Sequence, residues 1–178
     1  REPQRLYPQA SLGAHVLVYL DFDGKGVTGM ELALDKQLTD PGLRGKPVAL
    51  SLDLRAQAAL ESELGAAMTT FQARGAAGVI LDVASGEVMA LASLPTFNPN
   101  NIKGSNPEHF RNNVTQSVYE LGSSFKPLTM AFAIETGVAT SMAKRYDATV
   151  PLQVGGFRIR HDHAQKRWLN IPQTLMHS

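Results

Sequence analysis

The clearest fold signal in the chain is "AAGVILDVASGEVMALASLP", residues 76–95. Its first half is an apolar run, and its second half alternates between apolar and polar residues. The turn sequence "ASGE" joins the two halves, a pattern typical of a β-hairpin. Asp82 and Glu87 flank this turn, and their expected role is turn formation. The stretch therefore predicts two neighbouring antiparallel strands.

A long helix is predicted immediately before the hairpin, over residues 54–74. This segment is rich in alanine and leucine, which are strong helix formers. Its apolar residues recur at helical spacing, which predicts one inward face made of Leu54, Ala58, Leu60, Leu64, Ala67, Met68 and Phe71. A long helix beside hairpin-linked strands favours an α+β fold, in which an antiparallel sheet packs with helices.

The segments nearer the N-terminus continue this mixed pattern. We expect a strand ending in a glycine turn over residues 15–26, a short amphipathic helix over 28–38 and a strand over 48–53. The sequence "TDPGLRGKP", residues 39–47, interrupts every regular pattern and is the best candidate for a domain boundary.

The segments nearer the C-terminus predict a second hairpin and a helix. Residues 148–163 form the hairpin around a Gly-Gly pair, and "LNIPQTLMHS", residues 169–178, begins the helix. His161 and His163 have a spacing that can bind metal, or they end a solvated hairpin. We favour the solvated end, because no third ligand is evident and zinc sites need three or four. Trp168 is expected to anchor packing.

Composition excludes several classes of protein. The chain has 178 residues, 43% hydrophobic residues and a net charge of +1. This charge gives no indication of a nucleic-acid partner, and no apolar run approaches the ~20 residues that span a bilayer. The absence of cysteine excludes disulfides and a cysteine nucleophile. The chain begins without methionine and stops inside a predicted helix, so we expect a fragment of a longer protein.

The stretch "YELGSSFKPLTMAFAIETG", residues 119–137, holds the strongest candidate site. A serine hydroxyl becomes nucleophilic when a neighbouring base takes its proton, and a lysine can do so only when neutral. Burial and the positive end of a helix both favour neutral lysine. Apolar residues surround the predicted helix, which should therefore be buried: Phe125, Leu128, Met130, Ala131, Phe132, Ala133 and Ile134. Ser123 would lie at its amino end, with Lys126 on the same face and free backbone N–H groups for an oxyanion hole.

An ordinary structural interpretation of the same pair must be weighed. A serine before a helix commonly caps it, and a lysine in the first turn is commonly solvated. Ser-x-x-Lys also recurs by chance in long chains. The four-residue pattern alone therefore leaves both interpretations of Ser123 and Lys126 open.

Several further motifs resemble those of class B penicillin-binding proteins, the peptidoglycan D,D-transpeptidases. "YELGSSFKPLT" resembles their Tyr-Glu-Pro-Gly-Ser-Thr-Phe-Lys box. The other similar segments follow the family's order along nearly the whole chain: "RLYP" (5–8), "DGKGVTGME" (23–31), "SLDLRAQAALESEL" (51–64), "GVILDVASGEVMALASLPTFNPN" (78–100) and "FRIRHDHAQKRWLNIPQTLMHS" (157–178). Three positions depart from the usual pattern: Leu121 replaces proline, Ser124 replaces threonine, and Val18 stands where glycine is more common.

The resemblance implies a division of the chain and roles for three residues. Residues 1–45 would be the C-terminal part of a small, β-rich, non-catalytic N-terminal module. Residues 46–178 would be the N-terminal part of the transpeptidase domain. Ser123 would be the acylated nucleophile and Lys126 its proton acceptor. Ser178 would be the serine of the Ser-x-Asn motif, and the Lys-Thr-Gly motif does not occur in the chain.

The resemblance also implies a function that needs no metal or cofactor. The parent protein would cross-link peptidoglycan stem peptides through an acyl-enzyme during septal wall synthesis, and β-lactams would inhibit it. Divisome proteins would bind the N-terminal module. The catalytic part would face the periplasm from the bacterial inner membrane, with the membrane anchor outside this chain. We expect little or no activity from the 178 residues alone.

Three alternative functions share part of this pattern. A serine β-lactamase uses the same Ser-x-x-Lys chemistry, but "RLYP" and "DGKGVTGME" argue against it. A catalytically silent β-lactam sensor or divisome scaffold is the second alternative. An elongation-type transpeptidase is the third, and "FRIRHDHAQKRWL" favours the division type over it.

Overall fold

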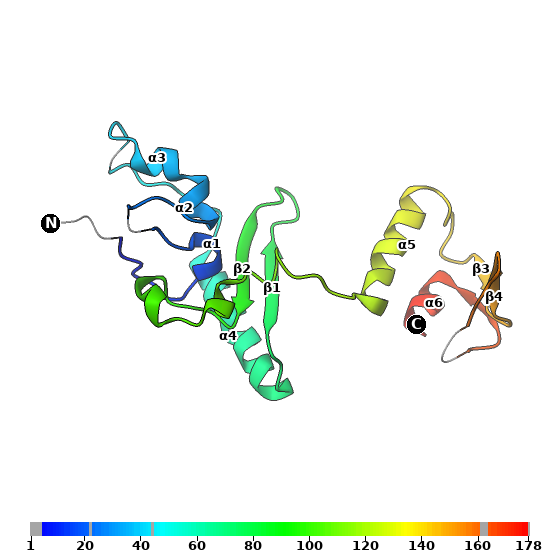
Figure 1. Ribbon diagram of the computed structural model, residues 1–178. Helices are drawn as coiled ribbons and strands as arrows, with labels where there is room; N and C mark the ends of the chain where they lie inside the picture. The colour runs from blue at the N-terminus through cyan, green and yellow to red at the C-terminus, as the bar shows by residue number, and fades with distance from the viewer. Residues whose placement is uncertain (1–4, 22, 44, 161–163, 178) are drawn as a thin grey trace. The chain divides into compact units, whose positions relative to one another are not determined.

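The computed structural model describes residues 5–21, 23–43, 45–160 and 164–177 (Figure 1). The chain divides into two compact units, residues 1–118 and residues 119–178. Each unit contains helices and antiparallel strand pairs, which confirms the predicted α+β class.

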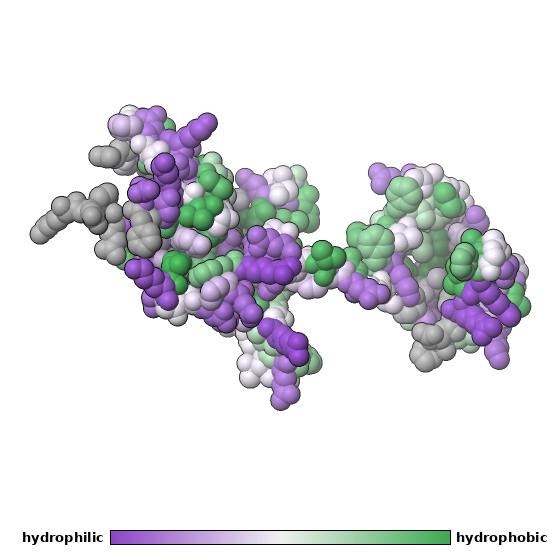
Figure 2. Space-filling model, in the orientation of Figure 1, coloured by the Kyte–Doolittle hydropathy of each residue, from purple (hydrophilic) through white to green (hydrophobic). Residues whose placement is uncertain are grey.

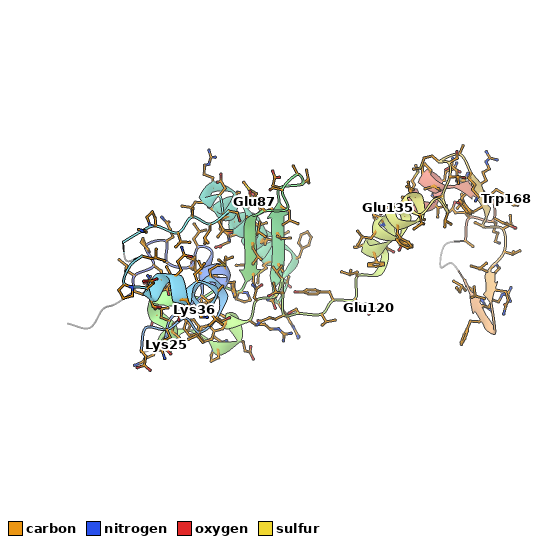
Figure 3. All side chains as sticks on the ribbon, turned by 90° about the horizontal axis from the view of Figure 1, so that it is seen from above. Lys25, Lys36, Glu87, Glu120, Glu135 and Trp168 are labelled. Carbon is orange, nitrogen blue, oxygen red and sulfur yellow. The ribbon has the colours of Figure 1, made fainter. Side chains whose placement is uncertain are left out.

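A hairpin and one long helix form the centre of the first unit. Strands β1 (Ala76–Leu81) and β2 (Val88–Leu94) pair antiparallel, with Ala76 opposite Leu94. The Asp82 carboxylate accepts hydrogen bonds from the backbone N–H groups of Ala84 and Ser85, so the predicted turn chemistry is confirmed. Glu87 lies at this end of the hairpin (Figure 3).

Helix α4 (Leu54–Phe71) packs against both strands, as Figure 1 shows. The Asp53 carboxylate caps its first turn by accepting from the N–H groups of Arg55 and Ala56. A Cβ on Gly78 would lie 3.0 Å from a Leu60 methyl carbon, so the glycine allows close helix–strand packing. The predicted inward stripe is only partly right: Leu60, Leu64, Ala67 and Met68 are half-buried, whereas Leu54, Ala58 and Phe71 are exposed.

Three short helices occupy the N-terminal segment: α1 (Ala14–Leu17), α2 (Gly29–Ala33) and α3 (Asp35–Thr39). The helix predicted over residues 28–38 is confirmed, although it breaks at Leu34. The strand predicted over residues 15–26 is wrong, because its first residues form α1, and among its described residues strand pairing is limited to an isolated bridge between Leu20 and Gly26.

The strand predicted over residues 48–53 is also wrong. This segment touches β2 through two isolated hydrogen bonds, from Asp53 N–H to the Met89 carbonyl and from the Ser51 hydroxyl to the Val88 carbonyl. A strand needs a repeating ladder of backbone bonds, and two contacts do not make one.

A small aromatic core joins the N-terminal segment to the loop after the hairpin. Ala14, Val18 and Phe97 are buried together. Tyr19, Ile102 and Phe110 pack around them. The loop itself folds into two 3₁₀ helices, η1 (Pro99–Gly104) and η2 (Pro107–Phe110). Residues on both sides of the predicted 45/46 boundary thus share one core, and that domain boundary stays a prediction.

The described residues of the second unit form two α-helices and two strand pairs. A 3₁₀ turn, η3 (Gly122–Phe125), leads into α5 (Lys126–Glu135). Strand β3 (Arg145–Asp147) pairs with β6 (Trp168–Asn170), and β4 (Leu152–Val154) with β5 (Phe157–Ile159), each antiparallel. Helix α6 (Ile171–Met176) begins at an Asn170–Gln173 capping box. The second hairpin and the C-terminal helix are therefore confirmed, whereas Trp168 is 54% exposed and anchors no core.

The predicted burial of the helix after Lys126 is wrong for this chain. Phe125, Leu128 and Phe132 are 51%, 60% and 67% exposed, and no residue of α5 is buried. Figure 2 shows hydrophobic residues gathered on the visible surface of this part. Among the described residues, α5 has its main element contact with η3, which is too short to cover it.

Candidate active site

Ser123 and Lys126 lie on one continuous helical path. Ser123 is the second residue of η3 and Lys126 is the first residue of α5. The backbone N–H of Lys126 donates to the carbonyl oxygen of Ser123. Because a 3₁₀ turn has three residues, side chains three apart align on the same face. The backbone therefore brings the two candidate residues together, as their spacing predicts.

Ser123 is not the helix cap of the ordinary interpretation. Leu121 occupies the cap position of η3 and Phe125 that of α5, and neither supplies a side-chain cap bond. Gly122 has a φ of +54°, a conformation that glycine adopts without strain. This turn starts the helical path one residue before Ser123, so the serine lies within the first turn and not ahead of it.

The burial predicted for this site is absent from the chain. Ser123 and Lys126 are both exposed. The sequence argument for a neutral lysine relied on burial among apolar groups, so that part of the argument finds no support in these residues. The alignment of the pair along the helix remains as the structural support for their proposed roles.

A hydrogen-bonded loop, residues 111–117, leads to the site, and we call it the anchored loop. The loop is attached to the hairpin through Ser93 on β2, whose residue is 2% exposed. The Ser93 hydroxyl donates to the Arg111 carbonyl at 3.2 Å and accepts from the Asn113 N–H at 2.9 Å. The Asn113 amide donates to the Leu94 carbonyl at 3.2 Å, and its oxygen accepts from the Ser117 hydroxyl at 2.9 Å. Local sequence patterns did not predict this contact, because it joins residues 20 positions apart.

The two N-terminal motifs meet around Glu31. Its carboxylate accepts from Arg5 Nη2 at 3.0 Å and from the Tyr7 hydroxyl at 3.2 Å. Burial, followed by the nearby Glu31 charge, raises the pKa of Tyr7 to about 12. The Asn100 side chain accepts from the Tyr7 N–H and donates to the Tyr7 carbonyl, at 2.9 and 2.8 Å. "RLYP" and the glutamate of "DGKGVTGME" thus form one cluster, which is held against the loop after the hairpin.

Three predicted positions fall outside the described residues: Ser178, His161 and His163. The described part of the chain contains no group of three or more metal-ligating side chains that could hold an ion. Within the same described residues, no helix has the length and apolar character to cross a bilayer.

An α+β fold with Ser-x-x-Lys at a helix start is the arrangement shared by penicillin-binding proteins and class A β-lactamases. Residues 76–178 match the family model of the penicillin binding protein transpeptidase domain. The chain belongs to that family, and the resemblance found in its sequence is confirmed.

Curated relatives match the chain almost end to end. The probable peptidoglycan D,D-transpeptidase FtsI of Caulobacter vibrioides is 40% identical over 179 residues, covering 99% of this chain and 30% of the relative. The peptidoglycan D,D-transpeptidase FtsI of Escherichia coli is 33% identical over 199 residues, covering 99% of this chain and 33% of the relative. The chain thus spans about a third of the length of these relatives.

Solved structures share the fold. Penicillin binding protein 3 of Mycobacterium tuberculosis superposes with a TM-score of 0.76 at 30% identity, covering 91% of this chain and 38% of that one. A peptidoglycan synthetase from Bifidobacterium adolescentis gives a TM-score of 0.79 at 20% identity, covering 98% of this chain and 36% of that one. At this lower identity the likeness supports the fold alone.

Proposed function

We propose that this chain is part of a longer peptidoglycan D,D-transpeptidase, with Ser123 as its acylated nucleophile and Lys126 as the proton acceptor. The observation that carries the proposal is the alignment of Ser123 and Lys126 on one face at the start of α5. This pair lies within the segment that matches the transpeptidase family, residues 76–178.

In the proposed reaction, the Ser123 Oγ attacks the carbonyl carbon between the two terminal D-alanines of a stem peptide. Lys126 takes the hydroxyl proton and passes it to the amine of the departing D-alanine as the peptide bond breaks. An amine of a neighbouring stem peptide then attacks the acyl-enzyme, which releases Ser123 and forms the cross-link. A β-lactam would acylate Ser123 in the same way and leave slowly. Unpaired backbone N–H groups at a helix start can stabilise the developing oxyanion.

The wider assignment belongs to the same proposal. Residues 1–45 would end a non-catalytic module that contacts divisome proteins, and residues 46–178 would begin the transpeptidase domain, with Ser178 as the serine of Ser-x-Asn. The parent would work in septal wall synthesis, anchored in the inner membrane with its catalytic part in the periplasm. Support comes from the FtsI relatives at 40% and 33% identity.

Intact-protein mass spectrometry of the full-length protein with a penicillin tests the assignment of Ser123. We expect the wild type and the Ser124→Ala control to gain one drug mass, and Ser123→Ala to gain none. Uptake by Ser123→Ala at the wild-type rate would contradict the assignment. Fast release of hydrolysed drug from the wild type would favour a β-lactamase instead.

The isolated chain should behave differently from its parent. Catalytic groups that act as a unit lose far more than a proportional share when some are missing. We expect a fluorescent penicillin to label the 178-residue chain very slowly or not at all. Labelling at the rate of the full-length protein would show that these residues suffice.

A further inference from the structure

The second unit carries a concentration of positive charge. Between residues 144 and 167 the sequence has six lysines and arginines and two aspartates. Residues 1–118, by contrast, contain ten basic and twelve acidic residues, so the excess is confined to one part of the chain. We call the six residues the basic surface: Lys144, Arg145, Arg158, Arg160, Lys166 and Arg167. All six are exposed, and Figure 2 shows hydrophilic residues gathered around strand β4.

These charges are not neutralised by ion pairs within the described residues. The ion pairs found there belong to the first unit, between Arg5 and Glu31 and between Arg55 and Asp53. In the basic surface, Arg167 Nη2 donates to a ring nitrogen of His177 at 3.0 Å. An imidazole nitrogen accepts a hydrogen bond only when it is unprotonated, so this contact leaves the positive charge of the arginine in place.

The aspartate beside β3 does not compensate the basic surface either. The Asp147 carboxylate accepts from the backbone N–H of Thr149 at 2.8 Å and from the hydroxyl of the same residue. Lys144 lies over a neutral ring, with its Nζ 5.5 Å from the centre of Tyr146. Asp162, the other aspartate of this segment, lies outside the described residues. The described side chains of this segment therefore leave a net positive charge facing solvent.

The register of one hairpin sorts its charged and apolar side chains. Arg158 on β5 pairs with Gln153 on β4, and the neighbouring pair is Phe157 with Val154. Successive residues of a strand point to opposite faces of a sheet, and residues two apart share a face. Arg158 and the following Arg160 therefore belong to a polar face of the hairpin, separate from its apolar face.

The basic surface differs from the exposed helix α5 in what a longer chain would do to it. Covering the apolar residues of α5 removes them from water and is favourable. Covering unpaired lysines and arginines is costly, and such side chains are almost never buried without a partner. We therefore expect the basic surface to stay at the surface of the full-length protein and to favour an anionic partner.

We propose that the basic surface binds the carboxylates of peptidoglycan stem peptides and so holds the cross-linking substrate at the transpeptidase domain. This inference rests on the proposed function, which supplies the substrate. A stem peptide that ends in D-alanine carries a free carboxylate, and a glycan strand repeats its stem peptides along its length. Several weak charge contacts made together bind such a polyanion far more tightly than any one of them alone.

Co-sedimentation of the full-length protein with purified peptidoglycan tests the proposal. The test variant combines four substitutions in the second unit: Arg158→Gln, Arg160→Gln, Lys166→Gln and Arg167→Gln. We expect its dissociation constant for peptidoglycan to be about tenfold higher than that of wild type, since each exposed charge pair contributes only a few-fold. Wild-type binding should weaken as the salt concentration rises. Peptidoglycan whose carboxylates have been converted to neutral amides should bind wild type and variant equally weakly.

A matched control removes the same number of charges from exposed positions of the first unit: Lys25→Gln, Lys36→Gln, Lys46→Gln and Arg74→Gln. It should bind peptidoglycan as the wild type does. A second control, Arg158→Lys with Arg160→Lys, keeps the charge and should keep most of the binding. The test variant should retain the wild-type melting temperature and should still be acylated by penicillin at Ser123, which shows that it is folded.

The possible failures are distinguishable. If Ser123→Ala still takes up penicillin, the proposed function falls, and the reason for expecting peptidoglycan as the partner falls with it. If acylation requires Ser123 but the two four-residue variants bind peptidoglycan equally, only the role of the basic surface is overturned. Undiminished binding of amidated peptidoglycan would overturn it as well. Sedimentation with vesicles of anionic phospholipid and not with peptidoglycan would assign the surface to a membrane and contradict the proposal.

Discussion

The side-chain amide of Gln57 on α4 pairs with the backbone of Leu91 on β2, accepting from its N–H and donating to its carbonyl, each at 2.9 Å. Gln57 is 1% exposed and also donates to Glu61, whose carboxylate accepts from the Gly13 N–H at 2.8 Å. One buried amide thus satisfies backbone groups of β2 outside its pairing with β1, and it links the hairpin to the N-terminal segment through Glu61.

Replacing Gln57 with leucine should destabilise the first unit. Leucine has a similar volume but leaves the Leu91 N–H and carbonyl unpaired, at a cost of about 1–3 kcal/mol in the free energy of unfolding. Denaturant unfolding followed by circular dichroism measures this loss. Glu63→Leu, at an exposed position of the same helix, is the control and should stay within about 0.5 kcal/mol of wild type. Equal stability of the two variants would contradict the importance of this pair.

His15 should make the first unit less stable in acid. It is 6% exposed, its Nε2 donates to the His109 carbonyl at 2.7 Å, and burial lowers its pKa from the ordinary 6.5. Below pH 6.5 the unfolded chain therefore binds a proton at His15 more readily than the folded one does. This contribution to stability is full above about pH 6.5 and declines as the pH falls through the lowered folded pKa.

The variant His15→Gln removes this titration. Its melting temperature should be lower than that of wild type at neutral pH but should change less between about pH 7.5 and 5.5. His177→Gln, at an exposed position, serves as the control and should keep the wild-type slope. A His15→Gln slope equal to that of wild type would contradict the prediction.

Tyr7 should make the same unit less stable in alkali. Its folded pKa of about 12 lies above the ordinary value of 10, so the folded state keeps the phenol proton that the unfolded state releases. The contribution of Tyr7 is full below pH 10 and is lost as the pH rises toward 12. In Tyr7→Phe the melting temperature should fall less steeply between pH 9.5 and 11 than in the control Tyr146→Phe. Parallel profiles would show that Tyr7 is not responsible.

Val18 tests a departure from the usual family sequence. Its backbone has φ +66° and ψ −136°, a conformation that favours glycine, while its side chain is buried beside Ala14 and Phe97. Alanine would lose most of the burial and keep the strain, whereas glycine would relieve strain of about 1–3 kcal/mol. We therefore expect Val18→Gly to be more stable than Val18→Ala.

The reverse order is expected at Val79, a half-exposed position on β1 that serves as the control. There glycine should be less stable than alanine by about 0.5–1 kcal/mol. Thermal unfolding of the four variants measures both orders. A Val18→Ala variant at least as stable as Val18→Gly would contradict the strain argument.

Local patterns predicted the regular elements well. The hairpin over residues 76–95, the helix over 54–74 and the helix after Lys126 all follow from short-range periodicity and turn chemistry, because the signals lie within a few residues of one another. The strand expected over residues 15–26 did not form, because local composition carries no information about contacts with distant residues. In the structure this segment packs Val18 and Tyr19 against Phe97, which lies far along the chain.

The amino-acid sequence by itself determined the family, the α+β class and the Ser123–Lys126 spacing, since each depends on residue types and their local order. Tertiary structure alone decided that Tyr7 meets Glu31 and that Ser93 holds Asn113, 24 and 20 positions apart. It also decided that α5 is exposed in this chain, because the burial of an apolar helix depends on which other elements cover it and not on its own residues.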